Sequence, residues 1–296
     1  MIISASRRTD IPAFYADWFM NRVRAGFCMV RNPRNPKQTT WVSLGPADVD
    51  AVVFWSKNPE PMLRHLHELD TMRFHYYFLF TINDYPVSLE PHVPPLAGRL
   101  ATFRDLAGRI GKGRVVWRYD PVILSACLDA ASHRRAFDKI ARSLEGYTQR
   151  VTISIVDLYS GTRRRLAAVE RLTGDRFVRD PFSLPRLEDL VRGLSSIAAD
   201  RGMDIQSCAE DDRLSRFGIN PGKCVDDGLV SSECGITVSS AKDRGQREKC
   251  GCVRSRDIGA NDSCVHGCEY CYATSSMERA VATYNAHDPE AEFLAG

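Results

Sequence analysis

The sequence lacks any long apolar run, and this absence limits where the protein can work. No stretch of its 296 residues approaches the roughly 20 apolar residues that a membrane-spanning helix needs. The opening residues, MIISASRRTDIP, also lack the apolar core and the small-residue cleavage site of a secretory signal peptide. We therefore expect a cytoplasmic protein with no membrane partner.

A strong charge bias is absent as well, because the formal net charge is only +3. A charge this small does not identify a nucleic-acid partner. It does not exclude one either, because basic clusters such as Arg163, Arg164 and Arg165 could contact phosphates. Internal repeats and low-complexity segments are also missing. Hydrophobic residues at 44% and charged residues at 26% argue against the disordered and fibrous classes.

Cysteine is scarce in the first two-thirds of the chain and concentrated near its end. Of the ten cysteines, only Cys28 and Cys127 precede the cluster that runs from Cys208 to Cys271. Disulfides are rare in the cytoplasm, so clustering of this kind indicates metal ligation.

Short β-rich apolar runs alternate with segments of helical spacing. The predicted strands are residues 2–5, 51–55, 76–82, 115–119, 151–156 and 203–207, and the predicted helices are 12–25, one from about 59, 96–110, 133–144 and 185–200. Such alternation is typical of parallel βαβ units. We predict an α/β fold with a partial (β/α)6 TIM-type barrel over residues 1–210. A cysteine-rich iron–sulfur segment, residues 211–296, is expected to pack on the barrel mouth. A doubly wound sheet is the alternative that the pattern permits.

Polar side chains follow the predicted strands where each one ends. The clusters are residues 7–10, 56–58, 81–83, 118–120, 154–157 and 208–210. Helix capping accounts for single Asp, Asn, Ser and Thr residues at such places. Capping does not account for Arg7, Arg8, Lys57 and Arg118, because helix N-termini are already electropositive. The carboxyl ends of parallel strands meet at one edge, so we expect one cavity there with an anionic ligand.

The most informative motif is CVHGCEYC at residues 264–271. The spacing of Cys264, Cys268 and Cys271 suits three irons of a [4Fe–4S] cluster and leaves the fourth iron without a protein ligand. That iron can hold the amino and carboxylate groups of S-adenosylmethionine (SAM). A zinc site with His266 as the fourth ligand is the competing interpretation, but the dense spacing favours the cluster.

Four further cysteines, Cys208, Cys224, Cys250 and Cys252, can supply a closed set of ligands. Such a set can hold an auxiliary [4Fe–4S] cluster or a zinc ion. Cys234 is left over, so other selections of four stay open.

The CxxxCxxC spacing, with Tyr270 directly before the last cysteine, resembles the cluster-binding loop of the radical SAM superfamily. The resemblance implies a partial barrel of six β/α units and catalytic roles for Cys264, Cys268 and Cys271. It also implies reductive cleavage of SAM to a radical that abstracts a substrate hydrogen, with an external electron donor of the flavodoxin or ferredoxin type. In most members the loop follows the first strand, whereas here it follows the sixth. The C-terminal segment would therefore have to deliver the cluster to the barrel mouth.

The resemblance also implies where SAM is bound. The glycine-glycine-glutamate motif that usually binds its amino group is absent after the second strand, where residues 57–60 stand instead, and Glu60 is our candidate for that role. Contacts to the SAM carboxylate and ribose are expected at Arg118 and Asp120 after the fourth strand and at Ser154 and Asp157 after the fifth. The remaining candidate cofactor-binding residues are Arg7, Lys57 and Asn58.

Nearly the whole chain resembles a bacterial and archaeal family known as a domain of unknown function, DUF1848. The matching stretches are SASRRTDIPAFY at 4–15, VFWSKNP at 53–59, VVWRYDP at 115–121, KDRGQREKCGC at 242–252 and DIGANDSCVHGCEYCYA at 257–273.

Taken together, these features predict a radical SAM-like enzyme whose substrate is a small molecule or a nucleic acid. One alternative is a non-catalytic iron–sulfur redox or sensor protein. The other is a zinc-stabilised barrel that acts on nucleic acid or as a hydrolase, with Asp10, Asp120, Asp157 and Glu210 as possible carboxylates.

Overall fold

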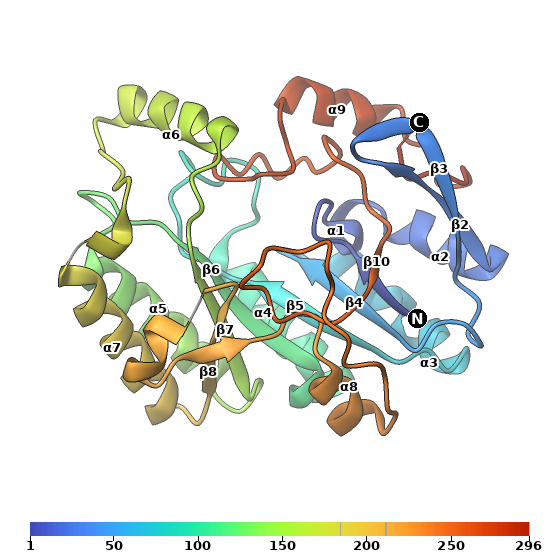
Figure 1. The fold of residues 1–296 in the computed structure, drawn as a ribbon, viewed down its shortest axis with the longest axis horizontal. Helices are drawn as coiled ribbons and strands as arrows, with labels where there is room; N and C mark the ends of the chain where they lie inside the picture. The colour runs from blue at the N-terminus through green and yellow to red at the C-terminus, as the bar shows by residue number, and fades with distance from the viewer. Residues whose placement is uncertain (184, 211, 296) are drawn as a thin grey trace.

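A parallel eight-stranded sheet forms the centre of the molecule, as seen in a computed structural model that describes residues 1–183, 185–210 and 212–295 (Figure 1). Its strand order is β10-β1-β4-β5-β6-β7-β8-β9. The strands are β1 (Ile2–Ala5), β4 (Ala51–Ser56), β5 (Tyr76–Thr81), β6 (Val115–Val122), β7 (Arg150–Ile155), β8 (Asp204–Cys208), β9 (Asn220–Gly222) and β10 (Arg256–Asp257). From β1 to β9 the order follows the chain, without the reversal of a doubly wound sheet. The predicted α/β fold with parallel strands is confirmed.

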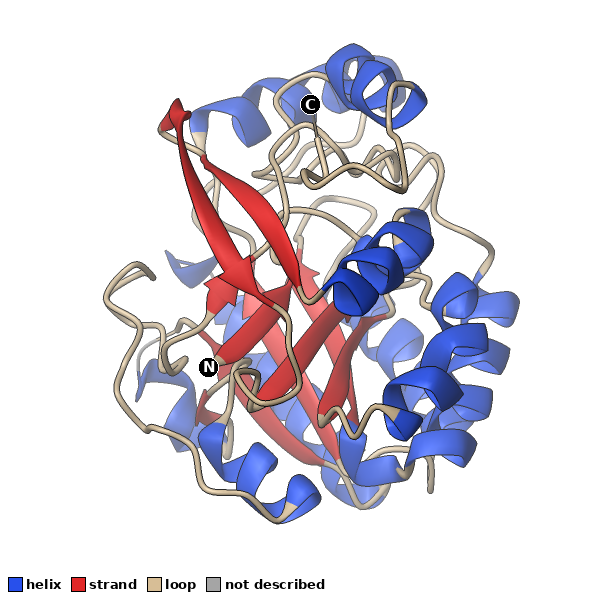
Figure 2. Cartoon of the chain, turned by 90° about the vertical axis from the view of Figure 1, so that its right-hand side faces the viewer, coloured by secondary structure: helices blue, strands red, loops and turns tan. Residues whose placement is uncertain are grey.

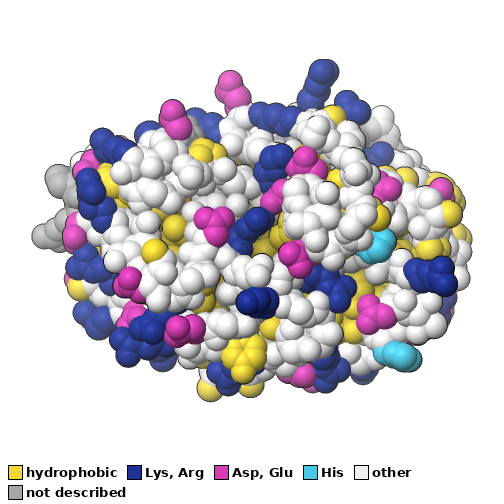
Figure 3. Space-filling view, turned by 90° about the horizontal axis from the view of Figure 1, so that it is seen from below, with side chains coloured by type: hydrophobic (Ala, Val, Ile, Leu, Met, Phe, Trp, Pro, Cys, Tyr) yellow, Lys and Arg dark blue, Asp and Glu magenta, His cyan; other side chains and the backbone are white. Residues whose placement is uncertain are grey.

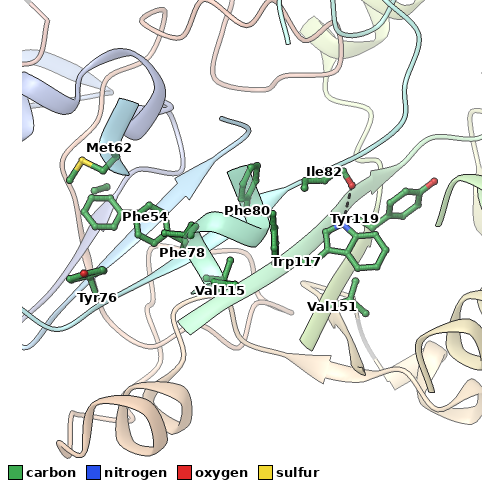
Figure 4. Close-up of a cluster of buried hydrophobic side chains, with 14 of the residues drawn as sticks. Phe54, Met62, Tyr76, Phe78, Phe80, Ile82, Val115, Trp117, Tyr119 and Val151 are labelled. Atoms are coloured by element: carbon green, nitrogen blue, oxygen red, sulfur yellow. Dashed lines mark hydrogen bonds between the residues drawn. The ribbon is translucent and has the colours of Figure 1, made fainter. Parts of the chain in front are cut away.

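Helices cover one face of this sheet. They are α1 (Ile11–Phe14), α2 (Ala16–Ala25), α3 (Leu66–Thr71), α4 (Leu96–Ile110), α5 (Ala130–Leu144) and α7 (Pro185–Asp200). Their apolar sides share one buried cluster with every second strand residue. In Figure 4 the rings of Phe54, Phe78 and Trp117 line this cluster, and Trp117 Nε1 donates to the carbonyl oxygen of Ile82 at 3.0 Å. Burial of these large rings is the main force that holds helices and sheet together.

The C-terminal segment covers the opposite face of the sheet. Val53, Tyr77 and Leu79 point to this side and share a second buried cluster with Cys224–Val253. The hydroxyl of Tyr77 donates to the carbonyl oxygen of Cys224 at 2.6 Å. Figure 1 shows this orange part of the chain crossing the sheet, with α8 (Asp227–Cys234) below it. The segment also supplies β9 and β10, so it is built into the same sheet.

Several elements differ from the predicted ones. The helix predicted over residues 12–25 is interrupted at Tyr15, whose hydroxyl donates to the carbonyl oxygen of Ser263 at 2.6 Å. The helix predicted from residue 59 begins as the 3-10 helix η1 (Glu60–His65) before α3. The prediction missed α6 (Ser160–Thr173) and the antiparallel hairpin of β2 (Phe27–Asn32) and β3 (Asn35–Ser43), whose long strands stand out in Figure 2.

The outer surface is polar and mixed in charge. Acidic and basic side chains are interspersed over the face drawn in Figure 3, in keeping with the small net charge. Within the described ranges, no helix is long and apolar enough to cross a membrane.

Candidate functional site

A cavity of about 400 Å³ lies at the carboxyl ends of the central strands. Six of the eight predicted cofactor-binding residues line it: Arg7, Lys57, Arg118, Asp120, Ser154 and Asp157. The parallel strands all end at this edge, which brings together residues that are far apart in the chain. In the structure these six residues, which lie at the ends of four different strands, line one cavity.

Two predicted site residues lie elsewhere. The backbone N–H of Asn58 donates to the Ser56 hydroxyl at 2.9 Å, in the turn that follows β4. Glu60 is exposed and lines a different surface hollow, together with Arg64 and Arg109. The structure therefore does not bring Glu60 to the cavity that holds the cysteines.

Cys264, Cys268 and Cys271 line the same cavity from the C-terminal side, and all three are free thiols. The N–H of Cys271 donates to the carbonyl oxygen of Cys268 at 3.0 Å, which closes a tight turn. Gly267 precedes that turn with a φ of +71°, a left-handed conformation that suits glycine. The cysteine loop, defined here as residues 264–271, thus reaches the strand ends although it is distant in sequence.

Burial sets the protonation of two of these thiols, Cys264 and Cys268. It raises the pKa of Cys264 to about 12 and the pKa of Cys268 well above its ordinary value, although the positive charge of Lys57 opposes the shift at Cys268. Without a metal, both thiols therefore keep their protons at neutral pH. A metal has to displace these protons when it binds.

Arg165 of α6 fixes the backbone of the cysteine loop. Its guanidinium donates to the carbonyl oxygens of Glu269 at 3.0 Å and Thr274 at 2.9 Å, and also to that of Cys271. The sequence analysis considered Arg165 only as part of a basic cluster that could contact nucleic acid. The helical spacing of Thr162, Leu166 and Val169, all buried on α6, is the signal that would have placed Arg165 on a helix.

A buried ion pair supports the loop from another side. Lys57 Nζ lies 2.7 Å from Glu90 Oε1, and the hydroxyl of Tyr270 donates to the same oxygen. Burial by itself would raise the pKa of Glu90, but the charges of Lys57 and Arg99 hold it below its ordinary value. Glu90 is therefore an anion that neutralises Lys57. It lies outside the polar clusters at the strand ends, so sequence reasoning missed it.

Asp257 organises the end of β1. It accepts hydrogen bonds from the Ser6 hydroxyl at 2.8 Å and the backbone N–H of Arg7 at 2.8 Å, and it forms an ion pair with Arg8 at 3.1 Å. These contacts fix the backbone after β1, from which Arg7 reaches the cavity. Asp257 also begins the DIGAND stretch, the only sequence signal that points to it.

His266 in the loop contacts Asp10, with Nε2 lying 2.8 Å from Asp10 Oδ2. The same carboxylate oxygen accepts the backbone N–H of Lys57 at 2.7 Å. The other ring nitrogen, His266 Nδ1, is buried and has no hydrogen-bond partner in the part of the chain that the structure describes. Asp10 thus links the loop to two strand ends.

Arg118 and Arg7 flank the indole of Trp55. The Arg118 guanidinium carbon lies 4.8 Å from the ring centroid, and that of Arg7 lies 5.1 Å away. Arg118 also donates to Asp120, which accepts a hydrogen bond from Ser154. Within the described residues, Arg118 Nε and Arg7 Nη2 are buried without a hydrogen-bond partner. Unsatisfied cationic donors of this kind favour an anionic ligand.

The second set of cysteines also comes together. The sulfurs of Cys208 and Cys224 are 3.3 Å apart, and the thiol of Cys252 is hydrogen-bonded to those of Cys224 and Cys250. Cys208, Cys250 and Cys252 line the same cavity as the first set. Cys234 lies apart at the end of α8, where Arg114 and Glu233 are its charged neighbours.

Neither set is arranged as a finished metal site. Across residues 1–183, 185–210 and 212–295, no group of three His, Cys, Asp or Glu side chains is placed so that it could hold a metal ion. Metal binding in either set therefore requires the thiols to turn from the positions they occupy here.

Comparison with known proteins identifies a family. No curated protein and no solved structure matches the chain. A family model described as a domain of unknown function (DUF1848) matches residues 2–273, a span that includes both cysteine sets and all strand ends around the cavity. The chain therefore belongs to the DUF1848 family.

Proposed function

We propose that the protein is a radical SAM-type enzyme, with a [4Fe–4S] cluster held by Cys264, Cys268 and Cys271 at the mouth of a partial (β/α)6 barrel. One observation carries the proposal: three free thiols from one short loop line the same cavity as the polar ends of five parallel strands. The sequential order of the strands and the helices on one face of the sheet support a barrel-type curvature.

The donor set fits the proposed cluster. Three thiolates are the ligands that iron–sulfur clusters take, and the loop brings no fourth cysteine with them. When bound, such a cluster supplies the electron that cleaves SAM and starts radical chemistry on a substrate.

The residues around the loop have two tasks in this proposal. Arg165 and the Lys57–Glu90 pair hold the loop backbone and Tyr270 in place, so that the thiols are presented to the cavity. The thiols are themselves partly buried, which limits their contact with water.

The walls of the cavity supply contacts for SAM. The guanidinium of Arg118 suits the carboxylate of SAM, and Asp120, Ser154 and Asp157 suit its ribose hydroxyls, as acceptors and donors of hydrogen bonds. Arg7 and Lys57 add positive charge. The proposal leaves out Asn58 and Glu60, because neither of them lines the cavity.

The proposed reaction also needs an external one-electron donor of the flavodoxin or ferredoxin type. A cytoplasmic location suits such a donor and keeps the thiols reduced. The substrate in this proposal is a small molecule or a nucleic acid.

The test is the reductive cleavage of SAM. We expect protein purified without oxygen to form 5′-deoxyadenosine from SAM when dithionite is added. The triple variant Cys264→Ala, Cys268→Ala, Cys271→Ala should form none, whereas Cys127→Ala, which changes an exposed cysteine far from the cavity, should match the wild type. An iron-loaded wild type that forms no 5′-deoxyadenosine would instead be an electron carrier or a sensor.

A zinc site is the second candidate, and His266 favours it. A histidine that binds a metal through one nitrogen usually bonds a carboxylate through the other. Here Nε2 contacts Asp10 and the buried Nδ1 is without a partner in the described ranges. Wild-type protein with zinc but no iron would support a Cys₃His site and overturn the cluster.

A further inference from the structure

We propose that Cys208, Cys224, Cys250 and Cys252 form a second metal centre with four thiolate ligands, facing the cavity that the cysteine loop also lines. The proposal does not depend on radical chemistry at the first set, because it rests on other residues and on other contacts.

The first argument is convergence. Cys208 ends β8, Cys224 stands just before α8, and Cys250 and Cys252 belong to an irregular stretch of the C-terminal segment. Their thiols nevertheless lie next to one another: Cys208 is beside Cys224, and Cys252 is beside both Cys224 and Cys250. The sulfurs of Cys208 and Cys224 are 3.3 Å apart. In a tetrahedral site with bonds of about 2.3 Å, neighbouring sulfurs lie roughly 3.8 Å apart. The separation of Cys208 and Cys224 is therefore close to the one that a shared metal would impose.

The second argument is the charge around these thiols. The buried guanidinium of Arg7 lies beside Cys252, and that of Arg118 lies near Cys208 and Cys224. Arg118 is paired with Asp120 and Arg7 lies near Asp257, yet each guanidinium keeps one buried nitrogen without a hydrogen-bond partner among the described residues. A tetrathiolate centre holding Zn²⁺ or an oxidised [4Fe–4S] cluster has a net charge of about −2, which these two guanidiniums favour.

The pattern of hydrogen bonds agrees with that charge. Cys252 Sγ already accepts the backbone N–H of Val225 at 3.3 Å. Arg7 Nη2 and Arg118 Nε are two of the buried donors without a partner among the described residues. Hydrogen-bond donors commonly surround the metal-bound sulfurs of such sites.

The third argument is the lack of regular structure nearby. Between residues 235 and 276 the structure assigns the two-residue strand β10 and an isolated bridge between Lys242 and Val253. Cys250, Cys252 and Val253 are nonetheless buried against the sheet. Long irregular segments inside compact domains need some other cross-link, and a metal that joins this stretch to β8 and α8 supplies one.

The test measures metal in the triple variant Cys264→Ala, Cys268→Ala, Cys271→Ala, which leaves only the second set. After purification without oxygen and reconstitution with iron and sulfide or with zinc, we expect roughly four irons or roughly one zinc per chain. Absorbance near 400 nm distinguishes the two metals. Adding Cys224→Ala and Cys252→Ala should abolish this metal, whereas adding Cys234→Ala, which changes the ungrouped cysteine of α8, should leave it.

A triple variant that keeps its circular dichroism but binds neither metal would overturn the proposal. If the variants do not fold, the wild type still decides: roughly eight irons, or four irons with one zinc, support it, and a single cluster without zinc contradicts it. Metal in the triple variant with no cleavage of SAM by the wild type would refute the proposed function alone. Cleavage of SAM by the wild type with no metal in the folded triple variant would refute this inference alone.

Discussion

Lys57 Nζ and Glu90 Oε1 form an ion pair of 2.7 Å whose carboxylate also accepts the hydroxyl of Tyr270, the residue before Cys271. The side chain of Glu90 is only 2% exposed. This pair therefore connects the end of β4 to the cysteine loop through a carboxylate that water does not reach.

Glu90→Gln should destabilise the protein, because it leaves the buried ammonium of Lys57 without a counter-charge. Removal of one partner of a buried pair costs about 3 kcal/mol or more in the free energy of unfolding. The control Glu68→Gln breaks the exposed pair with Arg24 and should cost about 1 kcal/mol or less. Denaturant titration measures both, and equal losses would contradict a supporting role for Glu90.

Gly267→Ala should loosen the cysteine loop. A Cβ atom there would lie 2.9 Å from Pro91 Cγ and 3.0 Å from His92 Cδ2, in a left-handed conformation. We expect a loss of about 2 kcal/mol or more and weaker retention of iron. Gly235→Ala, also left-handed but facing open space, should lose only about 1 kcal/mol and keep its iron. Similar iron content in both variants would show that the contact is unimportant.

Arg118→Gln should weaken the binding of SAM about tenfold or more, because a charge-assisted hydrogen bond to its carboxylate is lost. Equilibrium titration of SAM into unreduced, cluster-loaded protein measures this. Arg142→Gln, which removes an exposed arginine of α5, is the control. Unchanged affinity in Arg118→Gln would assign this arginine to the second cysteine set alone.

His133 of α5 is buried in neutral form. Its Nδ1 lies 2.7 Å from the Tyr119 hydroxyl, its Nε2 lies 2.9 Å from the Ile123 carbonyl oxygen, and the ring of Tyr85 packs edge-on against it. Burial lowers the pKa of His133, although the Ile123 carbonyl and the charge of Asp129 oppose the shift.

The folded pKa of His133 thus lies below the unfolded value of about 6.5. As the pH falls below that value, His133 binds a proton in the unfolded chain but not in the folded chain, so the free energy of unfolding declines. His133→Gln should reduce this decline between about pH 7 and pH 5, whereas the exposed His67→Gln should not. Denaturant titrations at several pH values measure it, and identical slopes in all three proteins would refute the assignment.

Local pattern was enough for most of the fold. The six predicted strands occur, and α4 has the predicted bounds, because buried apolar runs and an amphipathic period are properties of adjacent residues. The hairpin β2–β3 is only partly buried, and α6 buries just Thr162, Leu166 and Val169, so their patterns were weak.

The candidate site divides in the same way. The spacing of the cysteines predicted the cysteine loop, and the expected parallel topology predicted that the residues at the strand ends would lie together. Arg165 and Asp257 were not, because their partners lie 104 residues away at Glu269 and 251 residues away at Ser6.

The sequence alone determined that the fold is α/β, that its strand ends are polar and that eight cysteines cluster near its end, because each of these is a matter of neighbouring residues. Only the tertiary structure decided that Cys208 and Cys224 meet while Cys234 stays apart, and that both cysteine sets face one cavity. Those outcomes depend on how the C-terminal segment packs across the sheet, which brings together side chains that no short-range pattern connects.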